Sequence, residues 1–191
     1  MLEDFILVKG AISREEVSIY ADTMRATLAG GSAQVDWSQV VGSTIEYGSP
    51  LMSVLSRKVK PILEKETGLQ LCPTYNFTRL YTSGMSLDRH TDRPSCEISA
   101  TVCLDYDADY RWPIFCKDRY GKEHSIEMEV GDMVIYRGCD VEHWREKFKG
   151  SWHLQTFIHY VDKSGPYYPQ HAYDSRELPK IYHKIEAKYG K

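Results

Sequence analysis

Long apolar runs, internal repeats, paired cysteines and a strong net charge are all missing from this sequence. The longest apolar stretches fall far short of the ~18 residues that a membrane span needs. The apolar residues 6–8 are followed at once by Lys9, unlike the start of a signal peptide. The formal net charge of −3 argues against a nucleic-acid partner bound mainly through its phosphates. We therefore expect no signal peptide, no membrane span and no nucleic-acid partner.

The cysteines give a further exclusion. They are odd in number and form no C-x-x-C pair; the five are Cys72, Cys96, Cys103, Cys116 and Cys139. Structural disulfides persist in oxidising compartments and usually appear as an even framework. We therefore expect reduced thiols and a cytoplasmic location.

What remains is a chain of ordinary globular composition. Its 191 residues fit a single domain, 1–191, with a substantial core. The pattern divides this domain into a helical buttress over about 1–68, a β barrel over about 69–162, and a tail with a closing helix over 163–191.

Two helices are predicted in the first part. Ser13 followed by Glu16 is a capping-box signature, and apolar residues then recur at helical spacing. A second apolar face runs over residues 51–63, and Gly68 is its C-terminal signal. We expect Pro61 to kink this helix or to divide it in two.

Beyond residue 69 the apolar period changes from 3.6 to 2. Alternation is clearest over residues 98–104, where every second side chain is apolar. Further expected strands are 74–82, 112–117, 123–130, 132–137 and 152–161, and a last helix is expected over 176–188. Helices followed by a run of strands indicate a mainly β fold, a small barrel buttressed by helices.

The chemistry is concentrated around an H-x-D pair. His90 and Asp92 lie two residues apart, so in an extended strand they project from the same side. A third ligand must come from elsewhere in the chain. His143 is the candidate, because it follows the strand that Gly131 and Asp132 open, and strand pairing would bring it back beside His90. Two histidines and one carboxylate on one face of a metal form the facial triad of non-haem iron(II) enzymes.

Chance is the alternative explanation of such a pattern, since an isolated H-x-D occurs in many proteins that bind no metal. The remaining histidines outside the triad and position 153 are expected to be surface or hydrogen-bonded core residues: His124, His159, His171 and His183. Context distinguishes the triad from these residues.

That context is a family resemblance. The segment Arg79…Tyr81…Gly84…Leu87…His90…Asp92 resembles the R-x-Y-x-x-G-x-x-L-x-x-H-x-D motif of the prolyl-hydroxylase-like branch of the iron(II)/2-oxoglutarate oxygenases. The later Gly131-Asp132 strand and His143 resemble the family's second half, and the match covers roughly residues 70–162. The resemblance implies a double-stranded β-helix (jelly-roll) barrel, with iron(II) as cofactor and 2-oxoglutarate and O2 as co-substrates.

Carried over residue by residue, the resemblance assigns His90, Asp92 and His143 to iron and Tyr81 to a hydrogen bond with 2-oxoglutarate. It implies a dioxygenase that hydroxylates an amino-acid, peptidyl or other small organic substrate and releases succinate and CO2. Halogenating relatives lack the carboxylate ligand, so Asp92 favours hydroxylation.

One departure concerns the group that binds the distal carboxylate of 2-oxoglutarate. The family usually has Arg or Lys about ten residues after the distal histidine, where this chain has His153. Arg145 is the other candidate, since its charge is permanent and its guanidinium can bind a carboxylate through two bonds. We expect the larger contribution from His153.

Substrate contacts are expected from the residues that flank the triad. These are Arg93, directly after Asp92, and Trp144, directly after His143. Two other classes of function stay open: a cupin-like metalloenzyme that does not use 2-oxoglutarate, and a non-catalytic metal or ligand sensor. Cupins often carry H-x-H, whereas this chain carries H-x-D, and a sensor would not require an intact triad. The sequence leaves the prime substrate and the oligomeric state open.

Overall fold

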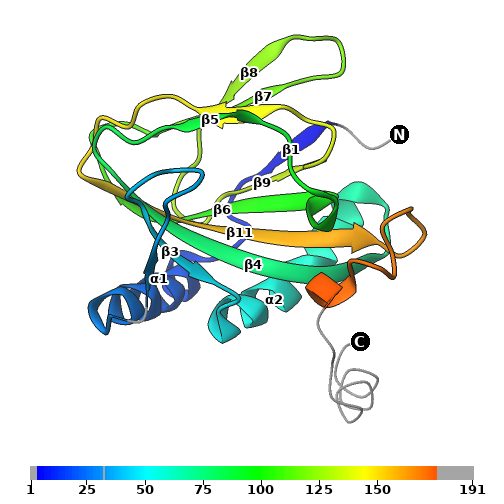
Figure 1. The fold of residues 1–191 in the computed structure, drawn as a ribbon, viewed down its shortest axis with the longest axis horizontal. Coiled ribbons are helices and arrows are strands. Elements are labelled where there is room, and N and C mark those ends of the chain that lie inside the picture. Colours follow the sequence, from blue (N-terminus) through cyan, green and yellow to red (C-terminus); the bar gives the residue numbers. More distant parts are fainter. Residues whose placement is uncertain (1–3, 32, 176–191) are drawn as a thin grey trace.

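The computed structural model describes residues 4–31 and 33–175, which form a mainly β fold with two α-helices (Figure 1). The expected helix over 176–188 lies outside the described residues. The strands make two antiparallel sheets, consistent with the expected double-stranded β-helix. In the described part of the chain no helix is both long enough and apolar enough to cross a membrane.

The larger sheet has seven strands in the order β1-β9-β6-β11-β4-β3-β2. Their bounds are β1 Phe5–Val8, β2 Gln34–Val35, β3 Thr44–Tyr47, β4 Leu71–Thr82, β6 Ile98–Asp107, β9 Met133–Tyr136 and β11 Trp152–Asp162. The smaller sheet has the order β5-β10-β7-β8. Its strands are β5 Leu87–His90, β7 Ile114–Lys117, β8 Glu123–Ile126 and β10 His143–Arg145.

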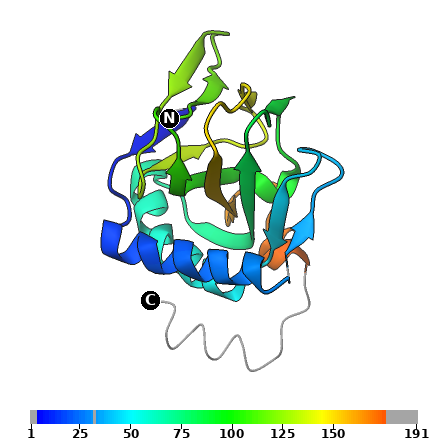
Figure 2. The ribbon, with the colours of Figure 1, turned by 90° about the vertical axis from the view of Figure 1, so that its left-hand side faces the viewer.

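Both helices lie against the outer face of the larger sheet, where they bury its apolar side chains (Figures 1 and 2). Helix α1, Arg14–Ala29, begins at Ser13, whose hydroxyl accepts a hydrogen bond from the Glu16 amide as the capping box predicts. Helix α2, Pro50–Thr67, ends at Gly68 in the left-handed conformation. The buttress leaves the opposite face of the sheet free to line the barrel.

Of the two outcomes expected at Pro61, a kink or a division of the second helix, the division does not occur. Helix α2 runs unbroken through this residue. Pro61 lies on the exposed face of the helix. Proline has no N–H group to donate to the carbonyl one turn earlier in the helix. On the exposed face water can donate to that carbonyl instead, so the helix continues.

The inner face of the larger sheet meets the smaller sheet across an apolar cluster around Cys103, Ile114 and Val134 and a second cluster rich in aromatic rings. Tyr136 from β9 packs 4.6 Å from the ring of His143 on β10, and Trp112 packs 5.4 Å from His153 on β11. The interior between the sheets therefore contains polar and ionisable side chains as well as an apolar core.

All five cysteines are free thiols, as expected, and the cytoplasmic location stays a prediction.

A short loop between β2 and β3 closes over one side of this interior. Asp36 organises it, because its carboxylate accepts hydrogen bonds from the amides of Ser38, Gln39 and Val40. The same carboxylate receives the guanidinium of Arg79 from β4 at 2.6 Å, and both side chains are almost fully buried. The ion pair thus ties the loop to the barrel wall.

Burial by itself would raise the pKa of Asp36, but the loop's hydrogen bonds reverse this effect and lower the pKa to about 2. A carboxylate with a pKa below its unfolded value stabilises the folded chain at every pH above that value. The contribution is then lost as the pH falls from about 4 toward 2.

We predict that Asp36→Asn lowers the free energy of unfolding by about 3–5 kcal/mol at pH 7, because it leaves the Arg79 cation buried without a partner. Urea unfolding measures the change. Glu129→Gln is the control, since Glu129 pairs with arginines on the surface, and it should cost less than about 1 kcal/mol. Equal losses in the two variants would show that the buried pair does not hold the loop.

Candidate metal centre

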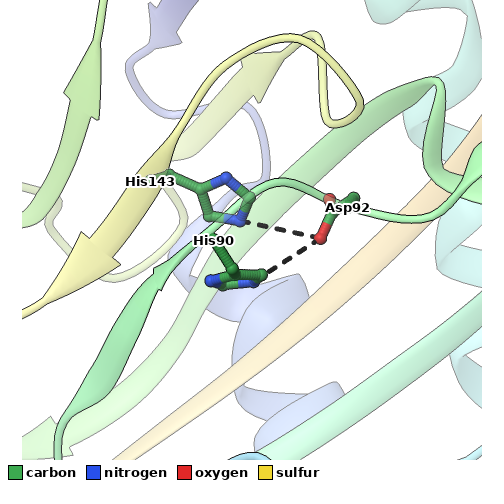
Figure 3. Close-up of side chains that lie close together, drawn as sticks. All are labelled: His90, Asp92 and His143. Carbon is green, nitrogen blue, oxygen red and sulfur yellow. Dashed lines mark ion pairs between the residues drawn. The ribbon is translucent and has the colours of Figure 1, made fainter.

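Strand pairing brings the two predicted histidines together. In the antiparallel pair formed by β5 and β10, His143 lies directly opposite His90. Opposite residues on one face of such a pair have adjacent side chains, and the two imidazole rings lie 4.3 Å apart (Figure 3). The expected return of His143 to His90 is confirmed.

Asp92 completes the group from the extended residues that follow β5. Its amide donates to the carbonyl of Gly138, which holds the chain beside the loop that leads to β10. One carboxylate oxygen lies 3.6 Å from Nε2 of His90 and 3.7 Å from Nε2 of His143 (Figure 3). The three possible ligand atoms lie within 4.8 Å of one another, close enough to share one metal ion.

Backbone carbonyls fix which nitrogen each imidazole offers. Nδ1 of His90 lies 2.8 Å from the carbonyl of Asp88, and Nδ1 of His143 lies 2.9 Å from the carbonyl of Val141. A carbonyl only accepts, so both Nδ1 atoms carry the hydrogen, and both Nε2 atoms, each within 3.7 Å of Asp92, keep a lone pair that a metal could use. Burial lowers the pKa of His143, which keeps this imidazole neutral and able to coordinate.

The second oxygen of Asp92 is held from behind. Ser99 on β6 donates its hydroxyl to this oxygen at 3.0 Å, and Nδ1 of His159 on β11 lies 2.9 Å from the same hydroxyl. His159 thus has the hydrogen-bonded core role that the sequence predicts, although it also lines the cavity beside the triad. No local motif marks Ser99, which sequence reasoning missed.

Asp92 also belongs to a second possible group, with Cys96 and His159. Burial, and then the nearby Asp92 charge, raise the pKa of the Cys96 thiol to about 12. The Cys96 sulfur lies 3.1 Å from the hydroxyl of Tyr75, and Nδ1 of His159 lies 2.9 Å from the hydroxyl of Ser99, so both atoms already have hydrogen-bond partners. The triad is the better candidate centre.

Gln39 is a second residue that the sequence did not single out. Its amide oxygen accepts from Arg79 at 3.1 Å, and its amide nitrogen lies 3.0 Å from Nε2 of His90. A guanidinium only donates, which fixes the amide with its NH2 toward the triad. The Asp36 loop therefore presents a hydrogen-bond donor to the metal centre.

The triad opens into a cavity of about 380 Å³. This volume is typical of sites for small molecules. One wall is aromatic and consists of Tyr47, Tyr75, Phe77 and Phe157. Arg93 lies at the mouth of the cavity, and Leu87, Arg79 and Tyr136 line its inner part.

Comparison with known proteins finds similarity in the fold but not in the sequence. No family model and no curated protein matches the sequence. A prolyl-4-hydroxylase from Pseudomonas putida matches the structure with a TM-score of 0.67 and 16% identity, over 84% of this chain and 93% of that one. The epimerase SnoN from nogalamycin biosynthesis, in complex with Fe3+, alpha ketoglutarate and nogalamycin RO, has a TM-score of 0.73 and 14% identity, over 93% and 86% of the two chains. A 2OG-Fe(II) oxygenase family protein from Burkholderia pseudomallei has a TM-score of 0.67 and 9% identity, over 83% and 85%.

The chain has the fold of the iron(II)/2-oxoglutarate oxygenases. At these identities the likeness establishes the fold alone, and the expected resemblance to the prolyl-4-hydroxylase branch extends to the structure. Within this oxygenase fold, the residues expected to bind co-substrate and substrate fall into three different environments.

The residues expected at the 2-oxoglutarate site lie deeper in the barrel than the triad. Tyr81 is fully buried and its hydroxyl lies 3.5 Å from Arg79. Arg145 is buried as well; it donates to the carbonyl of Trp112 at 2.7 Å and to the side-chain oxygen of Gln155 at 2.6 Å. Within the described residues no carboxylate pairs with Arg145, and its Nε has no hydrogen-bond partner.

His153 shares this inner end but differs in charge. Burial, and then the neighbouring Arg145 cation, lower its pKa well below the usual range, so the imidazole is neutral at pH 7. Its ring stacks on Tyr106, and its Nδ1 has no hydrogen-bond partner in the described part of the chain. His153 is therefore a polar neighbour of Arg145 without a charge of its own.

The two residues that flank the triad point in different directions. Arg93 reaches the mouth of the cavity, whereas Trp144 does not line it. Successive side chains in a strand point to opposite faces. Because His143 points into the barrel, the next side chain, Trp144, points outward. There its ring stacks on Phe115 and lies under the guanidinium of Arg89.

Gly138 gives a test of the centre that leaves all three ligands in place. A Cβ at this position would lie 2.6 Å from the Asp92 carboxylate and 2.2 Å from the Cys96 carbonyl. We predict that Gly138→Ala displaces Asp92 and raises the Kd for Co(II) by about tenfold or more. Visible absorption of bound Co(II) measures it. Gly30→Ala is the control, since Gly30 ends α1 far from the centre. An unchanged Kd in Gly138→Ala would contradict the role of Asp92.

Proposed function

We propose that the protein is an iron(II)- and 2-oxoglutarate-dependent dioxygenase that hydroxylates a small organic or peptidyl substrate and releases succinate and CO2. The observation that carries the proposal is that two imidazole Nε2 atoms and one carboxylate oxygen lie within 4.8 Å of one another beside a cavity.

The donor set fits the metal. Two neutral imidazoles and one carboxylate are the facial triad of non-haem iron(II) enzymes, which leaves coordination positions for other ligands. Iron(II) and 2-oxoglutarate, when bound, supply the oxidising chemistry with O2. The chain's own part is to present the ligands in the correct tautomer and to hold Asp92 through Ser99. A metal held by Nε2 of His90 would use the lone pair that now accepts from the NH2 of Gln39, and this amide would remain beside the centre as a donor.

The proteins of similar structure support the proposed metal and co-substrate more strongly than they support hydroxylation as the outcome of the reaction. SnoN was solved with Fe3+ and alpha ketoglutarate, and HygX from Streptomyces hygroscopicus with nickel and 2-oxoglutarate. The same fold also serves an epimerase and a carbocyclase. Hydroxylation rests on the prolyl-hydroxylase likeness of the sequence motif, and product analysis has to test it.

Arg145 is our proposal for the residue that anchors the distal carboxylate of 2-oxoglutarate, with Tyr81 as a hydrogen-bonding neighbour. A fully buried guanidinium without a carboxylate partner is costly to keep, which favours a site for an anion. The neutral state of His153 removes the charge that a competing anchor would need. This reverses the order expected from sequence position.

The first test concerns metal and co-substrate together. We predict that anaerobic addition of iron(II) and 2-oxoglutarate produces the weak visible charge-transfer band of a chelated keto acid. Asp92→Ala or His143→Ala should abolish it, because each variant removes one ligand of the triad. Iron binding without the band, and without succinate in air, would contradict the use of 2-oxoglutarate and favour a cupin-like metalloenzyme.

The second test concerns the anchor. We predict that Arg145→Gln raises the 2-oxoglutarate concentration at half-maximal band intensity by about 30-fold or more, because the charged partner of the carboxylate is lost. His153→Gln is the matched control from the same buried end of the barrel and should change this concentration much less. A larger effect of His153→Gln would return the role to His153. Circular dichroism shows whether both variants fold.

A further inference from the structure

The mouth of the cavity contains a guanidinium held in a fixed position. Arg93 follows Asp92 directly, and its guanidinium carbon lies 4.5 Å from the centre of the Tyr75 ring. One terminal nitrogen, Nη2, lies 3.4 Å from the hydroxyl of Tyr47. Stacking and hydrogen bonding together orient the planar guanidinium. A freely moving surface arginine would lack this fixed orientation.

A carboxylate from the chain itself already occupies this guanidinium. Asp174, in the η2 turn Ala172–Ser175, places one oxygen 3.2 Å from Nη2 of Arg93 and also accepts a hydrogen bond from Tyr47. Three successive residues there, Tyr173 to Ser175, have φ between 51° and 58°. L-residues rarely adopt this region, so contacts rather than backbone preference hold the turn.

Next to this pair lies the aromatic wall of the cavity. The rings of Tyr47 and Tyr75 are stacked with centres 5.0 Å apart, and His159 lies 4.5 Å from Tyr75. Phe77 and Phe157 continue the wall toward the triad. Such a surface suits the body of a planar or aromatic ligand.

The charged side chains of the cavity indicate which functional group the ligand carries besides its planar body. Asp92 is the one carboxylate among the described residues that line it, and the triad uses that carboxylate. Of the two arginines in the lining, Arg79 is neutralised by buried Asp36, whereas the one carboxylate that pairs with Arg93 among the described residues is Asp174 of the strained turn. An acidic ligand can take the place of Asp174, while an amine would be repelled by Arg93 and would have to compete with it for the Asp174 carboxylate.

We propose that Arg93, with Tyr47 and Tyr75, is the carboxylate-binding part of a substrate subsite, that the substrate is a small carboxylic acid with a planar or aromatic body, and that Asp174 occupies the subsite until such an acid displaces it. The assignment of the ligand as substrate rests on the proposed function. The binding itself does not.

Three probes with one body and different ends test the proposal: 3-phenylpropanoate, 3-phenylpropan-1-ol and 3-phenylpropylamine. Their affinities for the full chain are measured by calorimetry, with Mn(II) and excess 2-oxoglutarate and again without either. We expect the acid to bind about tenfold more tightly than the alcohol, and the amine to bind most weakly, because only the acid makes charge-assisted bonds with Arg93. Excess 2-oxoglutarate keeps the probe from the anchor at Arg145.

The variants locate the effect. Arg93→Gln should reduce the preference for the acid to about twofold or less, and Asp174→Asn should strengthen binding of the acid several-fold, because it removes the competing charge. Arg89→Gln is the matched control: Arg89 also stacks on an aromatic ring and pairs with a carboxylate, but it lies outside the cavity. It should leave the preference unchanged.

Equal affinities of acid and alcohol, an acid preference that survives Arg93→Gln, or weaker acid binding in Asp174→Asn would each overturn the proposal. Arg93→Lys, which keeps the charge and should keep part of the preference, covers the case in which Arg93→Gln does not fold. An intact keto-acid band with no acid preference would reject the subsite alone. An acid preference without the band would reject the oxygenase reaction and leave the subsite standing.

Discussion

The pairing of β10 with β5 is the interaction on which the centre depends. It aligns His143 with His90, and the loop that leads into β10 supplies the carbonyl of Gly138 that holds Asp92. The same register turns Trp144 outward and Arg145 inward. One antiparallel contact therefore sets both the candidate metal ligands and the cation behind them. A slip of one residue would exchange the faces and turn His143 and Arg145 out of the barrel interior.

The two buried arginines inside the barrel, Arg79 and Arg145, have different partners. Arg79 is neutralised by Asp36, and this pair fixes the loop that aims the amide of Gln39 at the centre. Arg145 is fully buried yet has only neutral partners among the described residues. Because a buried charge without a counter-ion is unfavourable, we assign Arg79 to the frame of the barrel and propose Arg145 as the residue that binds an anion. Arg93 at the mouth is the third cation, and its carboxylate partner comes from the strained η2 turn.

Local pattern predicted much of this architecture. The capping box at Ser13, the glycine stop at Gly68 and the change of period near residue 69 gave the two helices and most of the strands, because these signals depend on neighbours within a few residues. The expected alternative that Pro61 divides the helix in two is wrong, because local sequence does not reveal which face of the helix meets water.

The identity of the triad also follows from sequence, since H-x-D spacing and a distal histidine behind a Gly-Asp turn carry it. The surroundings of the triad do not. Gln39, Ser99 and His159 come from three distant segments and meet at the triad only because the β2–β3 loop, β6 and β11 pack around it. The charge of His153 and the orientation of Trp144 were decided by burial and strand register, which are properties of the folded chain. Sequence by itself thus determined which residues are the candidate metal ligands, and tertiary structure decided what surrounds them, because only long-range packing sets how far each side chain is desolvated and where it points.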